Sequence, residues 1–256
     1  MSFASVSFLL FFLVVLLLLL LVQRVLPFAE IKRRIICQGI LLIASYVFYG
    51  WWNMRLCLLL MGITWISFFT AVKKDEKHLR QSRISLLIGV GTPLAVLGIF
   101  KYYDFFVTSF CDVFHLTPGV LNLILPVGIS FYTFQALSYT IDVYTGKIEK
   151  EKSFLQFALY LSFFPQLVAG PIVKASEFLP QLKENRKVTL AGLESGIQIF
   201  VFGMFKKVVL ADNISVFVDE VYRSPQIFGS GTVALAVAAY AIQIYMDFSG
   251  YSDMAI

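Results

Sequence analysis

The sequence is poor in charged residues, in cysteine and in histidine. Charged residues make up 14% of the 256 residues, and there are three cysteines and two histidines. Together with a hydrophobic content of 59%, this balance excludes a soluble globular protein. The cysteines are odd in number and lack paired CxxC spacing, so they indicate neither a disulfide framework nor a metal site. We expect them to be small buried hydrophobic residues.

Long apolar runs dominate the chain. A transmembrane helix needs roughly 20 apolar residues, and runs near this length recur throughout. The expected spans are residues 5–22, 35–52, 54–72, 84–100, 120–144, 190–210 and 232–256. We therefore predict an all-α polytopic membrane protein, a multi-helix bundle that forms a single membrane domain over residues 1–256.

The loops predict how the chain is oriented. Residues 5–22 have no basic residue before them and no small-residue cleavage site after them, so we expect a retained span rather than a signal peptide. The loops at 23–34, 73–83 and 146–153 are net basic, and the positive-inside rule places them in the cytoplasm with the N-terminus outside. The net charge of +5 lies mainly in such loops, where it indicates contact with anionic headgroups rather than with nucleic acid.

Two segments depart from simple spans. Residues 105–116 are too short to cross a bilayer, so we expect a separate interfacial segment on the outer side, after the span that ends at Phe100. Pro126 and Gly128 are expected to break the start of the span at 120–144.

The stretch at 163–172 places Pro165, Gly170 and Pro171 inside an apolar run. Proline cannot donate to the helix ladder, so no continuous helix passes through this stretch. Net basic loops precede and follow it, which predicts that both lie on the same side of the membrane. We therefore predict a re-entrant segment over residues 154–173, since broken backbone at membrane depth is tolerated only when buried in protein or lining a water-filled cavity.

Lys206 and Lys207 do not fit the span at 190–210. The loop that follows, over residues 212–223, is net acidic and is expected outside. Either the two lysines extend to the outer headgroups, or the span is shorter or tilted. After the last span the chain stops at Ile256 without a polar tail, a glycine cap or a basic flank, so we expect a chain cut within an element.

Polar residues recur at helical spacing in two of the spans. The first stripe is Gly128, Tyr132, Gln135, Tyr139 and Asp142, and the second is Tyr240, Gln243, Asp247 and Tyr251. In each stripe, steps of three and four place the residues on one helical face. The stripes are either hydrogen-bonding contacts between helices or the lining of a polar cavity. Intramembrane carboxylates are costly, and they favour the cavity.

Four runs, in this order, resemble the membrane-bound O-acyltransferase (MBOAT) family. They are residues 125–135 (LPVGISFYTFQ), 163–172 (FFPQLVAGPI), 203–212 (GMFKKVVLAD) and 245–255 (YMDFSGYSDMA). We call them the first, second, third and fourth motif. The similarity covers essentially the whole chain. It is closest to the bacterial branch that contains the alginate O-acetylation protein, which is related to the D-alanyl transfer protein of teichoic acid modification.

This resemblance implies a helix bundle thinned around a tunnel in the bacterial inner membrane. An acyl donor would arrive at the cytoplasmic face, and a polysaccharide hydroxyl would accept the acyl group at the outer face. The residues expected along the substrate path are Tyr132, Gln135, Tyr139, Gln166, Gly170, Pro171, Gln243, Asp247, Ser249, Tyr251 and Asp253.

No catalytic residue can be named from the sequence. The resemblance implies a catalytic histidine in a Trp-His motif downstream of the fourth motif and a second histidine beyond it, and neither motif occurs here. His78 is expected to be a solvated loop residue, and His115 lies beside the outer interface. Asp247 and Asp253 could serve as acid or base if burial raised their pKa. No partner that would position a substrate is in view, so we expect them to support neighbouring site residues or to line the tunnel.

The sequence thus predicts the N-terminal part of a membrane O-acyltransferase that acylates, and most simply acetylates, an exported polysaccharide. The chain alone is expected to be inactive. We expect no bound cofactor and no metal, with membrane lipids, the polysaccharide and accessory acyl-transfer proteins as partners. The alternatives are a transporter or channel component, since broken helices also build substrate pathways, and a catalytically inactive membrane scaffold. No internal repeat supports a transporter.

Overall fold

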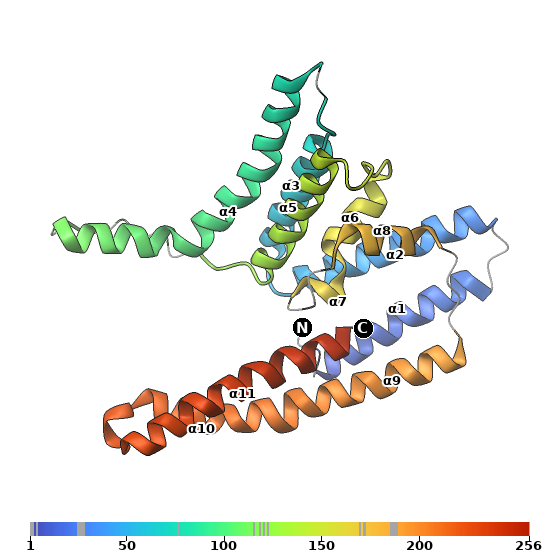
Figure 1. Cartoon of the computed structure of the whole chain (residues 1–256). Helices are drawn as coiled ribbons and strands as arrows, with labels where there is room; N and C mark the ends of the chain where they lie inside the picture. The colour runs from blue at the N-terminus through green and yellow to red at the C-terminus, as the bar shows by residue number, and fades with distance from the viewer. Residues whose placement is uncertain are drawn as a thin grey trace. The chain divides into compact units, whose positions relative to one another are not determined.

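The computed structural model describes residues 3, 5–24, 29–75, 77–114, 116–117, 119, 121, 123–168, 170, 173–184 and 189–255. These residues form helices and loops with no strand among them, which confirms the predicted all-α class. Within the described ranges, the helices long and apolar enough to cross a membrane are α1 (Val6–Arg24), α4 (Leu79–Phe114) and α11 (Ser230–Ala255) (Figure 1). The shorter α3 (Met54–Thr70) is also apolar.

The chain divides into two compact units, each described by itself. Unit 1 comprises residues 1–26, 169–171 and 186–256, and unit 2 comprises residues 27–168 and 172–185. The single membrane domain over the whole chain stays a prediction.

Unit 2 is built around a short helix that is buried from Phe157 to Ser162. Its elements are α2 (Glu30–Gly50), α3, α4, α5 (Ile129–Thr145), α6 (Phe154–Ser162), α7 (Phe164–Leu167) and α8 (Ala175–Lys183). Helix α6 packs against α2, α3, α5 and α8. Its Phe157 lies with its ring centroid 4.5 Å from that of Tyr139 on α5 and 5.6 Å from that of Phe68 on α3. The core of this unit therefore surrounds the segment that leads into the second motif.

Unit 1 is a helical hairpin. Helix α9 (Leu190–Met204) continues into the π-helix η1 (Phe205–Ala211) and then into α10 (Asp212–Arg223), and a 3-10 turn, η2 (Pro225–Ile227), leads to α11. Helix α11 packs back along α9, η1 and α10, as Figure 1 shows. Helix α1 belongs to the same unit, with the Phe8 ring stacked 6.5 Å from that of Phe200 on α9.

The structure corrects the predicted break after Phe100. Helix α4 is continuous from Leu79 to Phe114, so residues 105–114 extend it rather than forming a separate element. Lys101–Asp104 contains neither proline nor glycine, and nothing there interrupts the hydrogen-bond ladder. Figure 1 shows α4 changing direction between its teal and its green part.

Two predicted loops are helical. The basic loop after the second motif contains α8, whose Phe178 and Leu179 are buried, and the acidic loop at 212–223 is α10, whose Val218 and Val221 are buried. Both segments mix charged and apolar residues at helical spacing, so their charge content concealed an amphipathic pattern.

The predicted breaks at the first and second motifs are confirmed. Helix α5 begins only at Ile129, after Gly128 in the left-handed conformation with φ of 74°, so the helix is shorter than the predicted span. Phe163 leaves the helical conformation between α6 and α7. The second motif is therefore a broken helix, while its re-entrant position in a membrane stays a prediction.

Candidate functional site

The first and second motifs lie against each other within unit 2. A Cβ built on Gly128 would overlap the carbonyl oxygen of Leu167, so only glycine allows this approach. The positive φ of Gly128 makes the same demand. The start of α5 and the end of α7 are thus in backbone contact.

Helix α2 supplies hydrogen bonds to both motifs. The N–H of Phe164, which the break in the helix frees, donates to the hydroxyl of Ser45 at 3.1 Å, and Ser45 is fully buried. The Tyr49 hydroxyl donates to the carbonyl of Val127 at 3.1 Å. Broken backbone in an apolar region needs such partners. Sequence reasoning missed Ser45 and Tyr49, because single polar residues in an apolar run show no pattern.

Three of the five residues of the first polar stripe lie on one buried face of α5, whereas Gly128 precedes the helix and Asp142 is partly exposed and pairs with Lys147. Tyr132, Gln135 and Tyr139 are each 3% exposed or less. The Tyr160 hydroxyl on α6 donates to the carbonyl of Val173 at 3.2 Å and lies 3.5 Å from that of Gln135. Gln166 lies on α7 with its Oε1 buried and without a hydrogen-bond partner in the described part of the chain.

Other path candidates of the second motif lie at its end. Gly170 is buried after α7, and Pro171 lies outside the described residues. That these residues line a substrate path stays a prediction.

The third and fourth motifs are joined within unit 1 by ion pairs. The Lys206 ammonium on η1 lies 2.7 Å from Asp253 Oδ2 on α11 and donates to the Ser249 hydroxyl at 3.0 Å. The Lys207 ammonium lies 2.7 Å from both Asp247 and Asp212. The depth of the two lysines in a membrane stays a prediction. Each is held by carboxylates from the fourth motif.

The π-helical geometry explains how adjacent lysines reach one helix. A π-helical turn is wider than an α-turn and re-aims the side chains that it carries, and such turns are frequent at functional sites. Here η1 begins at Phe205, directly after the end of α9 at Met204, and carries both lysines. From the sequence alone, the two lysines did not fit their span. Asp247 and Asp253 of the fourth motif were the residues that could have indicated their ion-pair partners.

Two glycines set the distance between these helices. A Cβ on Gly250 would lie 2.7 Å from the carbonyl oxygen of Gly203, and a Cβ on Gly203 would lie 2.6 Å from that of Gly250. Small residues let helix backbones approach closely in membranes. The close approach brings the ammonium groups of η1 within hydrogen-bonding distance of α11.

The second polar stripe meets several partners within unit 1. Tyr240 packs against Tyr222 of α10, with ring centroids 5.6 Å apart, and Tyr251 stacks on Phe3 at 4.5 Å. Gln243 Oε1 is buried without a hydrogen-bond partner among the residues the structure describes. The stripe therefore contributes helix contacts through its tyrosines and an ion pair through Asp247.

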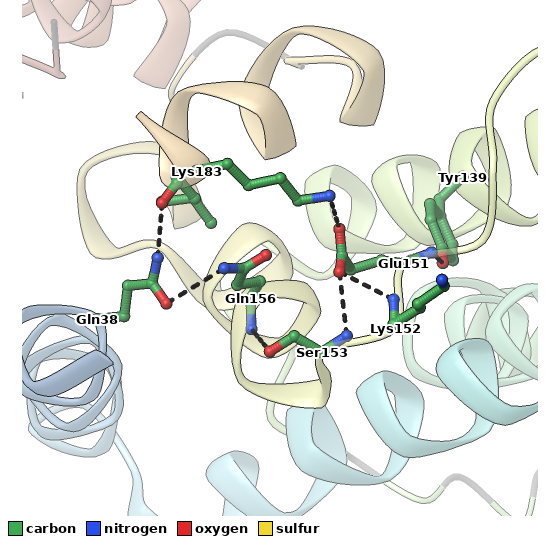
Figure 2. A network of polar contacts seen from close by, with 8 residues as sticks. Gln38, Tyr139, Glu151, Lys152, Ser153, Gln156 and Lys183 are labelled. Carbon is green, nitrogen blue, oxygen red and sulfur yellow. Dashed lines mark hydrogen bonds and ion pairs between the residues drawn. The ribbon is translucent and has the colours of Figure 1, made fainter. Parts of the chain in front are cut away.

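A further buried carboxylate, which sequence reasoning missed, lies in the loop between α5 and α6. Glu151 is 5% exposed, and its carboxylate lies 2.7 Å from the Lys183 ammonium at the end of α8 (Figure 2). The backbone N–H groups of Lys152 and Ser153 donate to Glu151 Oε1 at 2.8 and 3.0 Å, and its own N–H donates to the Tyr139 hydroxyl at 2.9 Å. Glu151 thus ties the loop to both α5 and α8.

The pKa of Glu151 reflects opposing effects. Burial raises it, but the Lys183 ammonium and the two backbone N–H groups together outweigh burial and hold the pKa below its usual value. A carboxyl group with a lowered folded-state pKa stabilises the fold above its unfolded pKa, and the contribution is lost as pH falls through the folded value.

We expect Glu151→Gln to reduce stability at neutral pH by about 1–3 kcal/mol, because the charged acceptor of three contacts is lost. The deficit should shrink as the pH falls below 4.5, the ordinary value of a glutamate, where wild-type Glu151 itself becomes protonated. Thermal unfolding of purified protein at a series of pH values measures this. Glu149→Gln, an exposed neighbour, serves as the control. A deficit independent of pH would show that the ion pair contributes nothing.

Of the two histidines, the structure describes only His78. His78 Nδ1 lies 3.0 Å from Asp75, and both side chains are exposed. This hydrogen bond to His78 is the main reason that the pKa of Asp75 is lowered. His115 lies outside the described residues. Among those residues no group of three or more metal-ligating side chains occurs.

Comparisons with known proteins show which family and which relatives the chain is similar to. Residues 147–256 match the membrane-bound O-acyltransferase family. The chain is 39% identical to the probable alginate O-acetylase AlgI of Pseudomonas putida, over 85% of the chain and 46% of that protein. It is 36% identical to the peptidoglycan O-acetyltransferase of Helicobacter pylori, over 84% of the chain and 46% of that protein.

A more distant relative is the teichoic acid D-alanyltransferase of Streptococcus thermophilus, 26% identical over 54% of the chain and 34% of that protein. The chain therefore spans about half the length of the curated relatives that it matches over most of its own length. The matched family region contains both ion-paired lysines of η1 and the aspartates of α11.

Proposed function

The chain belongs to the membrane-bound O-acyltransferase family, and on this premise we propose that it forms part of a bacterial membrane enzyme that transfers acetyl groups to hydroxyls of an exported polysaccharide. The observation that supports this most is the pair of relatives at 36–39% identity, one named for alginate and one for peptidoglycan. The two polymers share sugar hydroxyls as acceptors, and both names specify O-acetyl transfer. The transporter alternative has no comparable support.

Acetyl transfer to a hydroxyl needs a base that takes the proton and donors that hold the developing oxyanion. We propose that the four motifs form the walls of the path that the acyl group follows. The ammonium groups of Lys206 and Lys207 are held by carboxylates of α11. Their part is to fix α11 against η1 and so to position the polar residues of the fourth motif.

We propose that the base comes from a Trp-His motif outside these 256 residues, and that the chain alone transfers no acyl group. No Trp-His dipeptide occurs in the printed sequence. The partners in this proposal are membrane lipids, a polysaccharide acceptor and accessory acyl-transfer proteins, with no resident cofactor. The acyl donor would be a separate molecule that binds transiently.

The experiment that tests the proposed path uses the buried Gln135 and the half-exposed, ion-paired Asp247. In the complete gene product, Gln135→Leu and Asp247→Asn should each lower acetyl transfer about 10- to 100-fold, the effect of a misplaced substrate, while expression changes much less. Exposed matched controls are Gln181→Leu on α8 and Asp219→Asn on α10. Normal transfer in both test variants would assign the stripes to helix packing alone.

We also propose a multi-pass topology with the N-terminus outside and the loops on both sides of the re-entrant segment in the cytoplasm. Single cysteines at Lys150 and Lys183, in a background without the three native cysteines, should be shielded from a membrane-impermeant thiol reagent in intact cells. A cysteine at Asp219, in the segment proposed outside, is the positive control. Labelling at Lys150 or Lys183 from outside would contradict the re-entrant assignment.

A further inference from the structure

Two basic segments of unit 2 come together at one end of its helices. Residues 73–83 comprise most of the connection between α3 and α4 together with the first residues of α4, and residues 146–153 connect α5 to α6. The N–H of Lys74 donates to the carbonyl of Tyr144 at 3.0 Å. A Cβ on Gly146 would lie 3.1 Å from the Lys73 side chain. The two segments therefore form one surface, below called the basic end.

The basic end carries more positive than negative charge. Its described basic residues are Lys73, Lys74, Lys77, Arg80, Arg83, Lys147, Lys150 and Lys152, and its described acidic residues are Asp75, Glu149 and Glu151. Internal contacts already occupy two of these acids, because Asp75 pairs with His78 and Glu151 with Lys183. Lys74 and Lys152 have exposed side chains and make no ion pair within the described ranges.

One lysine of this surface is partly withdrawn from solvent. The Lys150 ammonium lies 5.4 Å from the centre of the Phe68 ring near the end of α3. Burial lowers the pKa of Lys150, which increases the benefit of an added anion beside it. The Lys150 contact also joins the loop after α5 to α3, so the basic end is a fixed part of the fold rather than two independent loops.

The side chains next to the basic end are apolar and exposed. Phe69 on α3 is 53% exposed, Ile84 on α4 is 47% exposed and Ile141 on α5 is 42% exposed. A soluble acidic protein would have to cover these residues with apolar surface of its own. A phospholipid offers both chemistries at once, with an anionic headgroup for the lysines and acyl chains for the neighbouring helix sides.

We propose that the basic end binds anionic phospholipid headgroups, with Lys74 and Lys152 as exposed contacts and Lys150 at the apolar border. The basic end adjoins the polar stripe of α5, since Glu151 contacts Tyr139 and Lys147 pairs with Asp142. The inference itself does not depend on the proposed acyl transfer. Binding should weaken with rising salt, because exposed charges are screened.

The test is native mass spectrometry of the purified protein titrated with phosphatidylglycerol and, in parallel, with phosphatidylcholine. Lys74→Gln/Lys152→Gln should weaken phosphatidylglycerol binding about thirtyfold, from about fivefold per lysine, and leave phosphatidylcholine binding unchanged. The matched control is Arg55→Gln/Lys101→Gln, which removes two exposed charges that do not belong to the basic end. Arg55 lies at the start of α3, and Lys101 lies about 22 residues, or roughly 33 Å, from the start of α4.

Equal phosphatidylglycerol binding by the test variant and the wild type would overturn the proposal, as would an equal loss in the control variant. The test variant could instead bind lipid normally but lose crosslinking to an acidic protein partner. That result would overturn the lipid proposal and assign the surface to protein recognition. Thermal unfolding of both double variants should match that of the wild type, since none of the four replaced side chains makes an ion pair in the described structure.

Discussion

Asp253→Leu is expected to destabilise unit 1 by about 2 kcal/mol, between the costs of breaking an exposed and a fully buried ion pair, because the Lys206 charge loses its partner. The Lys206 and Asp253 side chains are 20% and 23% exposed, and Asp253 is the acidic partner that the structure gives to Lys206. Acetyl transfer by the complete gene product should fall with stability. Thermal unfolding in detergent and a transfer assay on the same preparation measure both effects.

Three variants sharpen this experiment. Exchanging the charges, Lys206→Asp with Asp253→Lys, should recover much of the lost stability if the attraction matters. Asp247→Asn should cost less stability, because Lys207 keeps Asp212 as a second partner at 2.7 Å. The control is Glu220→Gln, which removes an exposed pair with Arg223 at 3.8 Å and should cost less than about 1 kcal/mol. Equal losses for Asp253→Leu and Glu220→Gln would show that the motif contact is incidental.

Residues 1–256 expressed alone are expected to enter the membrane but to transfer acetyl groups about 10²- to 10⁴-fold more slowly than the complete gene product, the usual contribution of a positioned base. Co-expression with the proposed downstream half should restore transfer. Replacing the histidine of its Trp-His motif should abolish it again. Incorporation of labelled acetate into polymer measures the rate.

A folded-state control is needed for that comparison. The fragment should elute as a single species and retain the Glu151-dependent pH response of unit 2, so that loss of transfer is not loss of structure. Robust transfer by residues 1–256 alone would move the catalytic centre into the chain, and His115, Asp247 and Asp253 would then be the residues to replace.

The sequence predicted the local backbone features well, because proline and glycine act over a few residues. Gly128 and the segment around Pro165 break their helices where the sequence indicated. The buried face of α5 followed from the spacing of Tyr132, Gln135 and Tyr139, since helical periodicity needs no knowledge of partners.

The sequence failed where an outcome depends on distant residues. The two lysines of η1 could be placed only once α11 lay beside them, and the charge of residues 212–223 concealed the buried valines of α10. Glu151 was unremarkable in a charged loop, yet the fold buries it against Lys183, 32 positions further along the chain. A single sequence does not show which opposite charges meet.

The four motifs that carry the family resemblance contact one another in the structure. The first motif touches the second through Gly128, and the third is joined to the fourth through Lys206 and Lys207. Residues that a sequence pattern groups only by order along the chain therefore lie in two structural pairs. Substitutions in one member of a pair should be partly compensated by changes in the other, as contacting residues do not act additively.

The most direct test of the proposed acetyl transfer is the acetate that mild base releases from the exported polysaccharide of cells with and without the gene that encodes this chain. We expect deletion to remove ester-linked acetate from one polymer. The wild-type gene should restore it, and a gene with Asp253→Leu should restore markedly less. Unchanged ester-linked acetate on every exported polymer of the deletion strain would contradict O-acetyl transfer to a polysaccharide.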